Sequence, residues 1–306
     1  MTPGFVDTHI HGFGGFDTSD GNKNGIISMA EGLAACGVAA FCPTTMTISR
    51  DNVFKAFDAV MNAKDELENG DREQPFARIL GIHLEGPFLS PERSGVQGLD
   101  HLETPEDGSD LIDELENRFP GLLKIIDIAP ELPGSIGFIR KYSGRYVLSI
   151  AHTNCDYDTA VEAIDAGVTS VTHLLNAMPP VDKRAPGVFC AAMDRGIYVE
   201  VICDGIHVQA PVLRLIFNSF DEDKIIVISD SMRGAGMPDG EYYLGDVKVI
   251  CKGGRTYYGP GGNLAGSVTD MTEEYNVLTA AGIPEDKVIK AMCSNPLKRL
   301  GCLNIH

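Results

Sequence analysis

The stretch GFVDTHI, residues 4–10, is a short apolar run that predicts a buried β-strand. The stretch VAAFCPTT, residues 38–45, repeats this pattern after a helix-like segment. Strands that are apolar almost throughout are typical of a parallel sheet whose two faces are both covered. Eight such runs alternate with helical patterns, at residues 4–10, 38–45, 77–85, 122–130, 145–153, 170–177, 197–205 and 224–230.

Eight β–α units in one chain most simply close into a (β/α)8 barrel of the α/β class. The alternative is an open, doubly wound sheet, but the segment GFGG at residues 12–15 lacks the G-x-G-x-x-G spacing and a following helix. We therefore predict one barrel over residues 1–306. The segment 238–263 alternates polar and apolar residues and is rich in Gly, which predicts one or two inserted β-hairpins before a last helix.

Composition narrows the class of protein and of partner. Lys and Arg number 25 against 43 Asp and Glu, and the net charge of −18 argues against nucleic acid or an anionic membrane as partners. No apolar run reaches the ~18 residues of a membrane span, and the N-terminus lacks the pattern of a signal peptide. The eight cysteines form no C-x-x-C pair, so we expect reduced thiols in a cytoplasmic protein.

Seven polar residues fall at the C-terminal ends of predicted strands or in the loops that follow, where barrels carry their active sites. They are His9, His11, Glu85, His152, His173, His207 and Asp230. His9 and His11 are one residue apart, so both side chains lie on the same face of their strand. His83 lies two residues before Glu85 and shares its face.

Each of these residues alone has a simpler structural explanation. A single His is often a hydrogen-bonded core residue, and Asp230 suits the N-cap of a helix. Glu85 is harder to explain, because an unpaired buried carboxylate is strongly unfavourable. A divalent cation explains Glu85 and the histidines together, and these ligand types suit zinc or ferrous iron with a position left open for water.

The same residues predict a reaction class. A bound metal lowers the pKa of its water towards ~7 and so supplies hydroxide at neutral pH. Asp230 can then act as general base and afterwards as the acid that protonates the leaving group. His207 can polarise a carbonyl oxygen. This combination predicts metal-assisted hydrolysis of a C–N or ester bond.

The chain also carries, in this order, the strings PGFVDTHIHG, GIHLEGPFLSP, AHTN, THLLNAMPP, RAPG, DGIHV, ISDSM, GAGMPDGEY and LAGS. Together they resemble the motifs of the N-acetylglucosamine-6-phosphate deacetylase family of the amidohydrolase superfamily, over nearly the whole chain. The resemblance implies release of acetate from N-acetylglucosamine 6-phosphate, a phosphorylated amino sugar, to give glucosamine 6-phosphate. Two alternatives stay open: a deacetylase of N-acetylgalactosamine 6-phosphate or another N-acyl sugar, and an inactive barrel that only binds sugar phosphate.

The resemblance also implies roles for individual residues. Glu85, His152 and His173 would hold the main metal, and His9 and His11 would complete a second site with Glu85 bridging. Asp230 matches the catalytic Asp beside the metal, and His207 matches the His at the substrate carbonyl. The phosphate-binding positions match Asn176, the Ala177 amide and Arg184. One or two divalent ions per chain are implied, zinc or iron first and cobalt or manganese as alternatives, in a homodimer.

Two departures from the family accompany these matches. Gln97 stands where some relatives place a His that reaches the phosphate of a neighbouring subunit, so we assign Gln97 to substrate binding only by position. Relatives also carry a leading segment and a tail that form a small β-sandwich, which this sequence lacks. We therefore expect a barrel without its sandwich, either truncated or naturally minimal, with lower stability or altered association.

Overall fold

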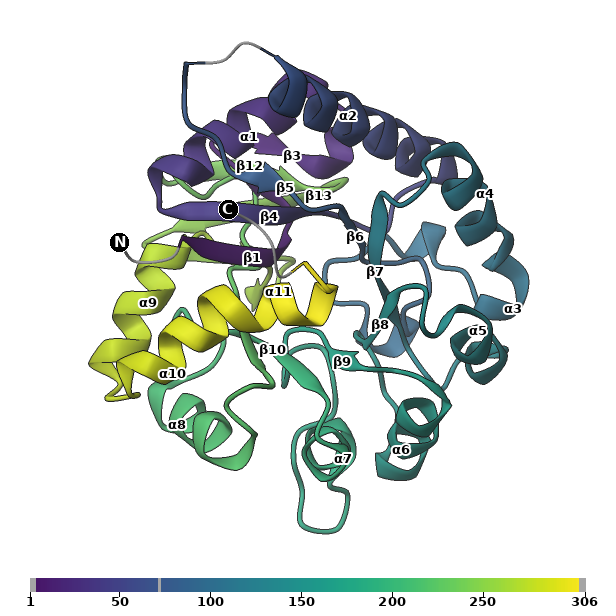
Figure 1. Ribbon diagram of the computed structural model, residues 1–306. Helices are drawn as coiled ribbons and strands as arrows, with labels where there is room; N and C mark the ends of the chain where they lie inside the picture. Colours follow the sequence, from purple (N-terminus) through teal and green to yellow (C-terminus); the bar gives the residue numbers. More distant parts are fainter. Residues whose placement is uncertain (1–3, 71–72, 303–306) are drawn as a thin grey trace.

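The computed structural model describes residues 4–70 and 73–302. Its central element is a ring of parallel strands in the order β1-β4-β6-β7-β8-β9-β10-β11, with β5 beside β4 (Figure 1). Backbone hydrogen bonds from Asp230 to His9 and from His11 to Ser231, 3.0 and 2.9 Å long, join the chain after β11 to β1 and close the ring. The predicted (β/α)8 barrel is therefore confirmed. The strands are β1 (Phe5–Ile10), β4 (Val38–Thr45), β5 (Arg78–Ile79), β6 (Ile82–Leu84), β7 (Leu123–Ile128), β8 (Val147–Ile150), β9 (Ser170–Val171), β10 (Tyr198–Ile202) and β11 (Ile225–Ile228).

Most of the observed strands are shorter at their ends than the predicted runs, and two of the runs differ in other ways. The run 77–85 is divided into β5 and β6 at Gly81, whose φ of +150° only glycine adopts readily and whose added Cβ would lie 2.6 Å from the Leu122 carbonyl oxygen. The run 170–177 forms sheet only at Ser170–Val171, because the chain turns away from the barrel wall through residues with positive φ.

Helices surround the ring on its outer side (Figure 1). Their apolar residues face the strands, as in α2, where Val53, Phe57 and Val60 are buried, and the Ser49 side chain caps the first turn. The outer helices are α1 (Lys23–Ala35), α2 (Arg50–Asn69), α4 (Asp110–Arg118), α5 (Ser135–Tyr142), α6 (Tyr157–Ala166), α7 (Gly187–Arg195), α8 (Ala210–Ser219) and α9 (Met271–Ala280), with the short α3 (Pro105–Gly108) before α4. None of the helices in the described ranges is long and apolar enough to cross a membrane.

The C-terminal helices cross the end of the barrel at which the strands begin. Figure 1 shows α10 (Glu285–Ile289) and α11 (Asn295–Leu300) running over the ring, joined by a π-helical turn at Lys290–Ser294. Asn295 donates from Nδ2 to the carbonyls of Glu222 and Ile225, at the start of β11. Arg299 enters the barrel and pairs with Glu200 of β10, Nη2 to Oε1, at 2.6 Å. The helix thereby closes this end of the barrel.

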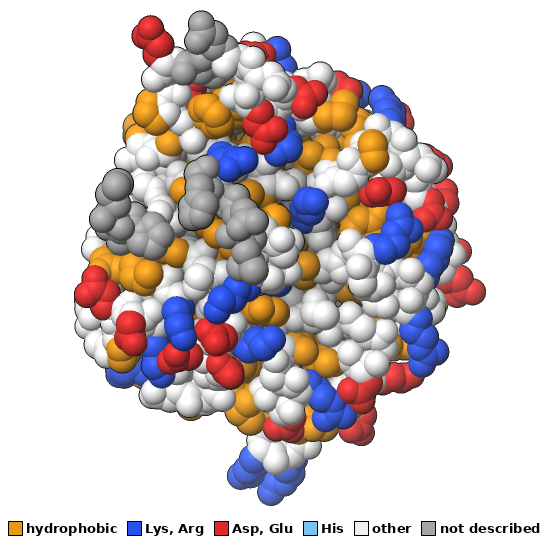
Figure 2. All heavy atoms as spheres, viewed as in Figure 1, with side chains coloured by type: hydrophobic (Ala, Val, Ile, Leu, Met, Phe, Trp, Pro, Cys, Tyr) orange, Lys and Arg blue, Asp and Glu red, His pale blue; other side chains and the backbone are white. Residues whose placement is uncertain are grey.

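The face seen in Figure 2 is this same end. Acidic and basic side chains alternate along its outer helices, with hydrophobic side chains exposed between them. The segment before α7 projects from the molecule in Figure 1, and basic side chains cover its tip in Figure 2. Lys183 and Arg184 of this segment are exposed.

The segment expected to form one or two inserted hairpins builds a single four-stranded antiparallel sheet. Its strands are β12 (Gly240–Leu244), β13 (Val247–Lys252), β14 (Arg255–Tyr258) and β15 (Asn263–Leu264). A small hairpin of β2 (Gly12–Phe13) and β3 (Phe16–Asp17) follows β1. Both lie at the C-terminal ends of barrel strands, where they flank the site described next.

Candidate active site

The polar residues predicted from the sequence converge at the C-terminal ends of the barrel strands. Glu85 follows β6, and its Oε1 lies 3.1 Å from Nε2 of His152, after β8, and 3.1 Å from Nε2 of His173, after β9. All three side chains are buried. Their donor atoms lie within 4.8 Å of one another, so one metal ion fits between them.

A second group lies on the other side of Glu85. The Nε2 atoms of His9 and His11, on and just after β1, are 3.3 Å apart. Asp230, after β11, places Oδ1 at 3.4 and 3.3 Å from these two nitrogens. Glu85 Oε2 is 3.2 Å from His11 Nε2, while its Oε1 faces the first group. The carboxylate of Glu85 therefore lies between both groups, as a ligand shared by two ions would.

The charge of each group in this cluster depends on the charges of its neighbours. Burial alone raises the pKa of the Glu85 carboxyl, but the surrounding histidines more than offset this and hold it well below its usual range. Burial opposes charge on His173, yet the adjacent Glu85 raises the pKa of that imidazole to about 9. The Asp230 pKa is also lowered, because His11 and His9 outweigh burial. The carboxylates are thus ionised and need positive charge beside them, which protons or a divalent cation can supply at the same atoms.

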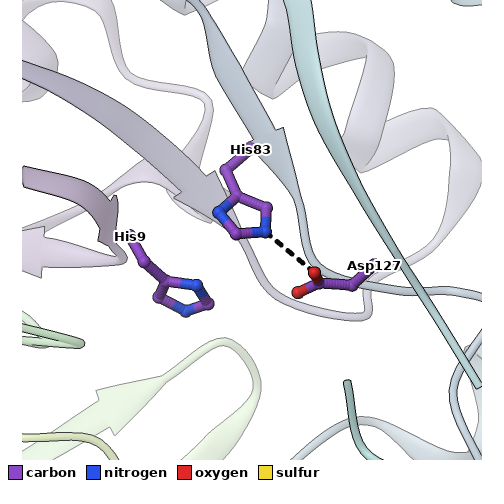
Figure 3. A group of neighbouring side chains, drawn as sticks. All are labelled: His9, His83 and Asp127. Atoms are coloured by element: carbon purple, nitrogen blue, oxygen red, sulfur yellow. Dashed lines mark ion pairs between the residues drawn. The ribbon is translucent and has the colours of Figure 1, made fainter. Parts of the chain in front are cut away.

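A buried ion pair lies beside His9 (Figure 3). His83 Nε2 is 3.0 Å from Asp127 Oδ1, and the other ring nitrogen of His83 donates to the Thr8 carbonyl at 3.0 Å. The rings of His9 and His83 meet edge to face at 4.6 Å. His9 Nδ1 and Asp127 Oδ2 have no hydrogen-bond partner among the described residues. His9, His83 and Asp127 each place one donor atom within 4.8 Å of the others, so Asp127 adds a further buried carboxylate beside the metal-binding groups.

The backbone is strained where these ligands sit. His152, His173 and Asp230 have φ of +41°, +34° and +48°, in the left-handed region that side chains other than glycine avoid. The Ser267 amide donates to the Asp230 carbonyl at 2.7 Å and so holds this conformation in place. Strain of this kind persists only where surrounding contacts fix it, and it is concentrated at functional sites.

His207 is held by a neighbouring acid that sequence reasoning did not identify. Its Nδ1 is 2.7 Å from Oδ2 of Asp204, whose Oδ1 accepts from the amides of Ile206 and His207. Burial raises the pKa of Asp204, but His207 and these amides lower it by more. This contact orients the ring and leaves Nε2 as the atom that faces the pocket. The signal was present in the string DGIHV, where an Asp three residues before the His can reach it.

A pocket of about 400 Å³ opens over both groups, a size typical of small-molecule sites. The predicted residues His11, Glu85, Gln97, His152, His173, Asn176, Ala177, His207 and Asp230 line it. Leu244, Tyr258 and Leu264 of the antiparallel sheet form an apolar wall. The structure thus brings together residues that are up to 219 positions apart in the chain (230 − 11).

Three placements differ from the expected arrangement or were not foreseen. Arg184 is exposed in the segment before α7 and is not among the lining residues. Among the described residues that line the pocket, Arg93 is the one with a positively charged side chain. It lies two positions after the quoted string GIHLEGPFLSP. Gln97 is buried and contacts Glu85 of its own barrel, whereas the position it occupies was expected to face the phosphate of a neighbouring subunit.

The model of the amidohydrolase family matches residues 1–304. The chain belongs to the amidohydrolase family. Among the relatives of this amidohydrolase, N-acetylglucosamine-6-phosphate deacetylase of Bacillus subtilis (strain 168) is 36% identical over 275 residues, which cover 89% of this chain and 68% of the relative. N-acetylgalactosamine-6-phosphate deacetylase of Escherichia coli O157:H7 is 29% identical over 307 residues, covering 98% and 78% of the two chains.

A solved structure gives the same result for the fold of this amidohydrolase. A mutant N-acetyl-D-glucosamine-6-phosphate deacetylase from Mycobacterium smegmatis, in complex with N-acetyl-D-glucosamine-6-phosphate, superposes with a TM-score of 0.90 at 30% identity. The match covers 98% of this chain and 77% of that one. The resemblance inferred from the sequence motifs is therefore confirmed.

Proposed function

We propose that this amidohydrolase removes the acetyl group from N-acetylglucosamine 6-phosphate and gives acetate and glucosamine 6-phosphate. The observation that carries the proposal is the shared carboxylate of Glu85 between two histidine groups, at the floor of a pocket that Asp230 and His207 also line. Relatives with this named activity match 89–99% of the chain. A hydrolase acting on a linear amide bond is the reaction class that this arrangement supports.

The donor set fits a divalent metal. Imidazole nitrogens and carboxylate oxygens suit zinc or iron, and cobalt or manganese as alternatives. Glu85, His152 and His173 would hold the first ion, and His9, His11 and Asp230 a second, which gives one or two ions per chain. When bound, the metal supplies Lewis-acid activation of the substrate amide and of water.

The protein's own residues then move the proton and orient the substrate. Asp230 is ionised and reaches into the pocket, so it can accept a proton from the attacking water and deliver it to the departing amine. His207, fixed by Asp204, can donate from Nε2 to the acyl oxygen. The apolar wall at Leu244, Tyr258 and Leu264 excludes water from one side of the pocket.

The phosphate is proposed to bind at the polar residues of the pocket that do not belong to the metal-binding groups. Asn176 and the Ala177 amide line the pocket there, and Arg93 brings the positive charge that an acidic protein needs for a phosphorylated substrate. Arg184, in the exposed segment before α7, is kept as a proposed phosphate contact because of the resemblance alone. The homodimer, the cytoplasmic location and the single-domain organisation over residues 1–306 likewise remain proposals.

N-acetylgalactosamine 6-phosphate is the second candidate substrate, since a deacetylase with that name is 29% identical over 98% of the chain. The two sugars differ at one hydroxyl configuration. Acetate release from each, compared as kcat/KM, decides between them. No release from either sugar by protein that carries metal would support the third alternative, a barrel that only binds sugar phosphate.

Asp230→Asn tests the proposed mechanism. We expect kcat to fall by about 10²–10⁴-fold, the usual contribution of a general acid–base residue, while elemental analysis still finds the first ion, which Glu85, His152 and His173 would hold. Arg195→Ala, which removes an exposed pair with Asp165 on α6, is the matched control and should leave kcat unchanged. A wild-type protein that binds less than ~0.5 metal per chain and releases no acetate would refute the enzymatic proposal.

A further inference from the structure

Gln97 occupies a position from which the resemblance implied contact with a substrate phosphate, yet it is only 5% exposed. Its Oε1 accepts a hydrogen bond from the Thr47 amide at 2.7 Å. Its Nε2 donates to Glu85 Oε2 at 2.6 Å. The backbone amide of Thr47 can only donate, so the side-chain oxygen of Gln97 must face it, and the amide nitrogen must face Glu85.

Gln97 contacts Oε2 of Glu85, the oxygen that lies beside His11 of the second group of ligands. Glu85 Oε1 lies 3.1 Å from both His152 and His173 and 3.8 Å from His9, whereas Oε2 lies 3.2 Å from His11. A carboxylate rotates easily about its last torsion. A contact that distinguishes the two oxygens is therefore needed to keep each one beside its own ligands. Gln97 is such a contact, and the loop after β4 anchors it through Thr47.

We propose that Gln97 is a positioning residue that holds Glu85 Oε2 toward the His9–His11–Asp230 group and thereby retains the second metal ion. It makes no contact with the substrate phosphate, and this inference rests on the proposed metal-dependent function. An oxygen with two lone pairs can accept from Gln97 and bind an ion at once. Partners that orient metal ligands in this way typically contribute 10–100-fold to metal affinity.

Two variants of Gln97 separate positioning from phosphate binding. Gln97→Met keeps the length of the side chain and removes both polar atoms. Gln97→Asn keeps the amide but is one methylene shorter, so it cannot reach Thr47 and Glu85 together. Arg93→Ala is the matched control, because Arg93 lines the same pocket and its proposed contact is with the phosphate.

The measurement is zinc uptake by metal-free protein, in competition with a chelating indicator, followed by KM for N-acetylglucosamine 6-phosphate at saturating zinc. We expect both Gln97 variants to bind the second ion about 10–100-fold more weakly and the first ion with unchanged affinity. KM should stay within about twofold of wild type in the Gln97 variants, since a contact with a phosphate contributes more than this. Arg93→Ala should show the reverse, with raised KM and unchanged zinc uptake.

The outcomes are distinguishable. A second ion held as tightly by both Gln97 variants as by the wild type overturns the inference, as does a rise in their KM equal to that of Arg93→Ala. A wild type that takes up a single ion also overturns it but leaves the proposed deacetylase intact. A wild type that takes up no zinc refutes the proposed function itself. Circular dichroism of Gln97→Asn, which preserves the polarity of the site, shows that a loss of zinc does not come from unfolding.

Discussion

Replacing Arg299 with methionine tests how much the C-terminal helix contributes to the barrel interior. Arg299 is 9% exposed and enters the barrel from α11, where Nη2 lies 2.6 Å from Glu200 Oε1 and Nη1 donates to Ser170 Oγ at 3.0 Å. Burial raises the pKa of Glu200, but the charges of Arg299 and His83 lower it by more, so the carboxylate is ionised. In Arg299→Met this carboxylate keeps the hydrogen bond from Thr8 Oγ1 and loses its ion pair.

The expected size follows from this geometry. Removing one partner of a buried ion pair costs about 3–5 kcal/mol, because the remaining charge stays in an interior without compensation. In a chain of this size that corresponds to a fall in Tm of roughly 5–8 °C. The loss depends on pH. In the wild type the lowered pKa of Glu200 stabilises the folded state at pH values above the ordinary carboxyl pKa. In the variant, burial without Arg299 raises the pKa of Glu200, so the folded state loses stability as pH rises. The difference in Tm should therefore widen from pH 5 to pH 8.

The assay is thermal unfolding followed by circular dichroism for the wild type, Arg299→Met, Glu200→Gln and the double variant. The double variant should regain at least half of the loss, because no charge is then left buried. Lys298→Met is the matched control, since the neighbouring Lys298 makes an exposed pair with Asp223 at 3.3 Å and should change stability by less than about 1 kcal/mol. A fall in Tm below ~2 °C for Arg299→Met, or losses that simply add in the double variant, would show that the pair is not a structural support of the barrel.

Two further predictions concern buried acids outside the metal-binding groups. Burial and the nearby charge of Asp204 raise the pKa of Glu274 on α9 well above its ordinary value, so the unfolded chain loses this proton first and stability falls with rising pH by up to about 1.4 kcal/mol per unit. Glu274→Gln should make the free energy of unfolding, measured in urea between pH 5 and 8, depend less on pH. An unchanged dependence would show that a group other than Glu274 carries the proton. Asp204→Asn, which loses the acceptor for His207 Nδ1, should lower kcat/KM by about 10²–10⁴-fold with little change in Tm. Normal kcat/KM in this variant would show that the ring needs no such support.

The barrel could be predicted because its strands lie in apolar runs that alternate eight times with helical patterns, and β4 begins and ends at the predicted residues. The run at 170–177 was less predictable. His173 and Leu175 continue an apolar stretch by composition, but their positive φ takes the chain out of the sheet. An apolar stretch indicates that its residues are buried. It does not distinguish a buried strand from a buried turn that follows the strand.

The site was predictable to the extent that its residues end strands. Glu85, His152 and His173 each follow an apolar run, so the closure of the barrel alone brings them together. Gln97 and Arg93 lie in the loop after β6, and no periodicity places a loop side chain. The antiparallel sheet that supplies Tyr258 to the pocket was expected as one or two hairpins, without its place beside the site, because that placement depends on contacts beyond the segment's own residues.

The left-handed backbone at His152, His173 and Asp230 sets a limit on how this barrel can be engineered. Each of these residues costs about 1–2 kcal/mol relative to a relaxed conformation, a cost that glycine avoids. Selection for heat resistance alone would therefore favour glycine at the positions where the chemistry resides. A library screened for thermostability needs a simultaneous screen for acetate release, because at these three positions the most durable barrel and the working enzyme are different sequences.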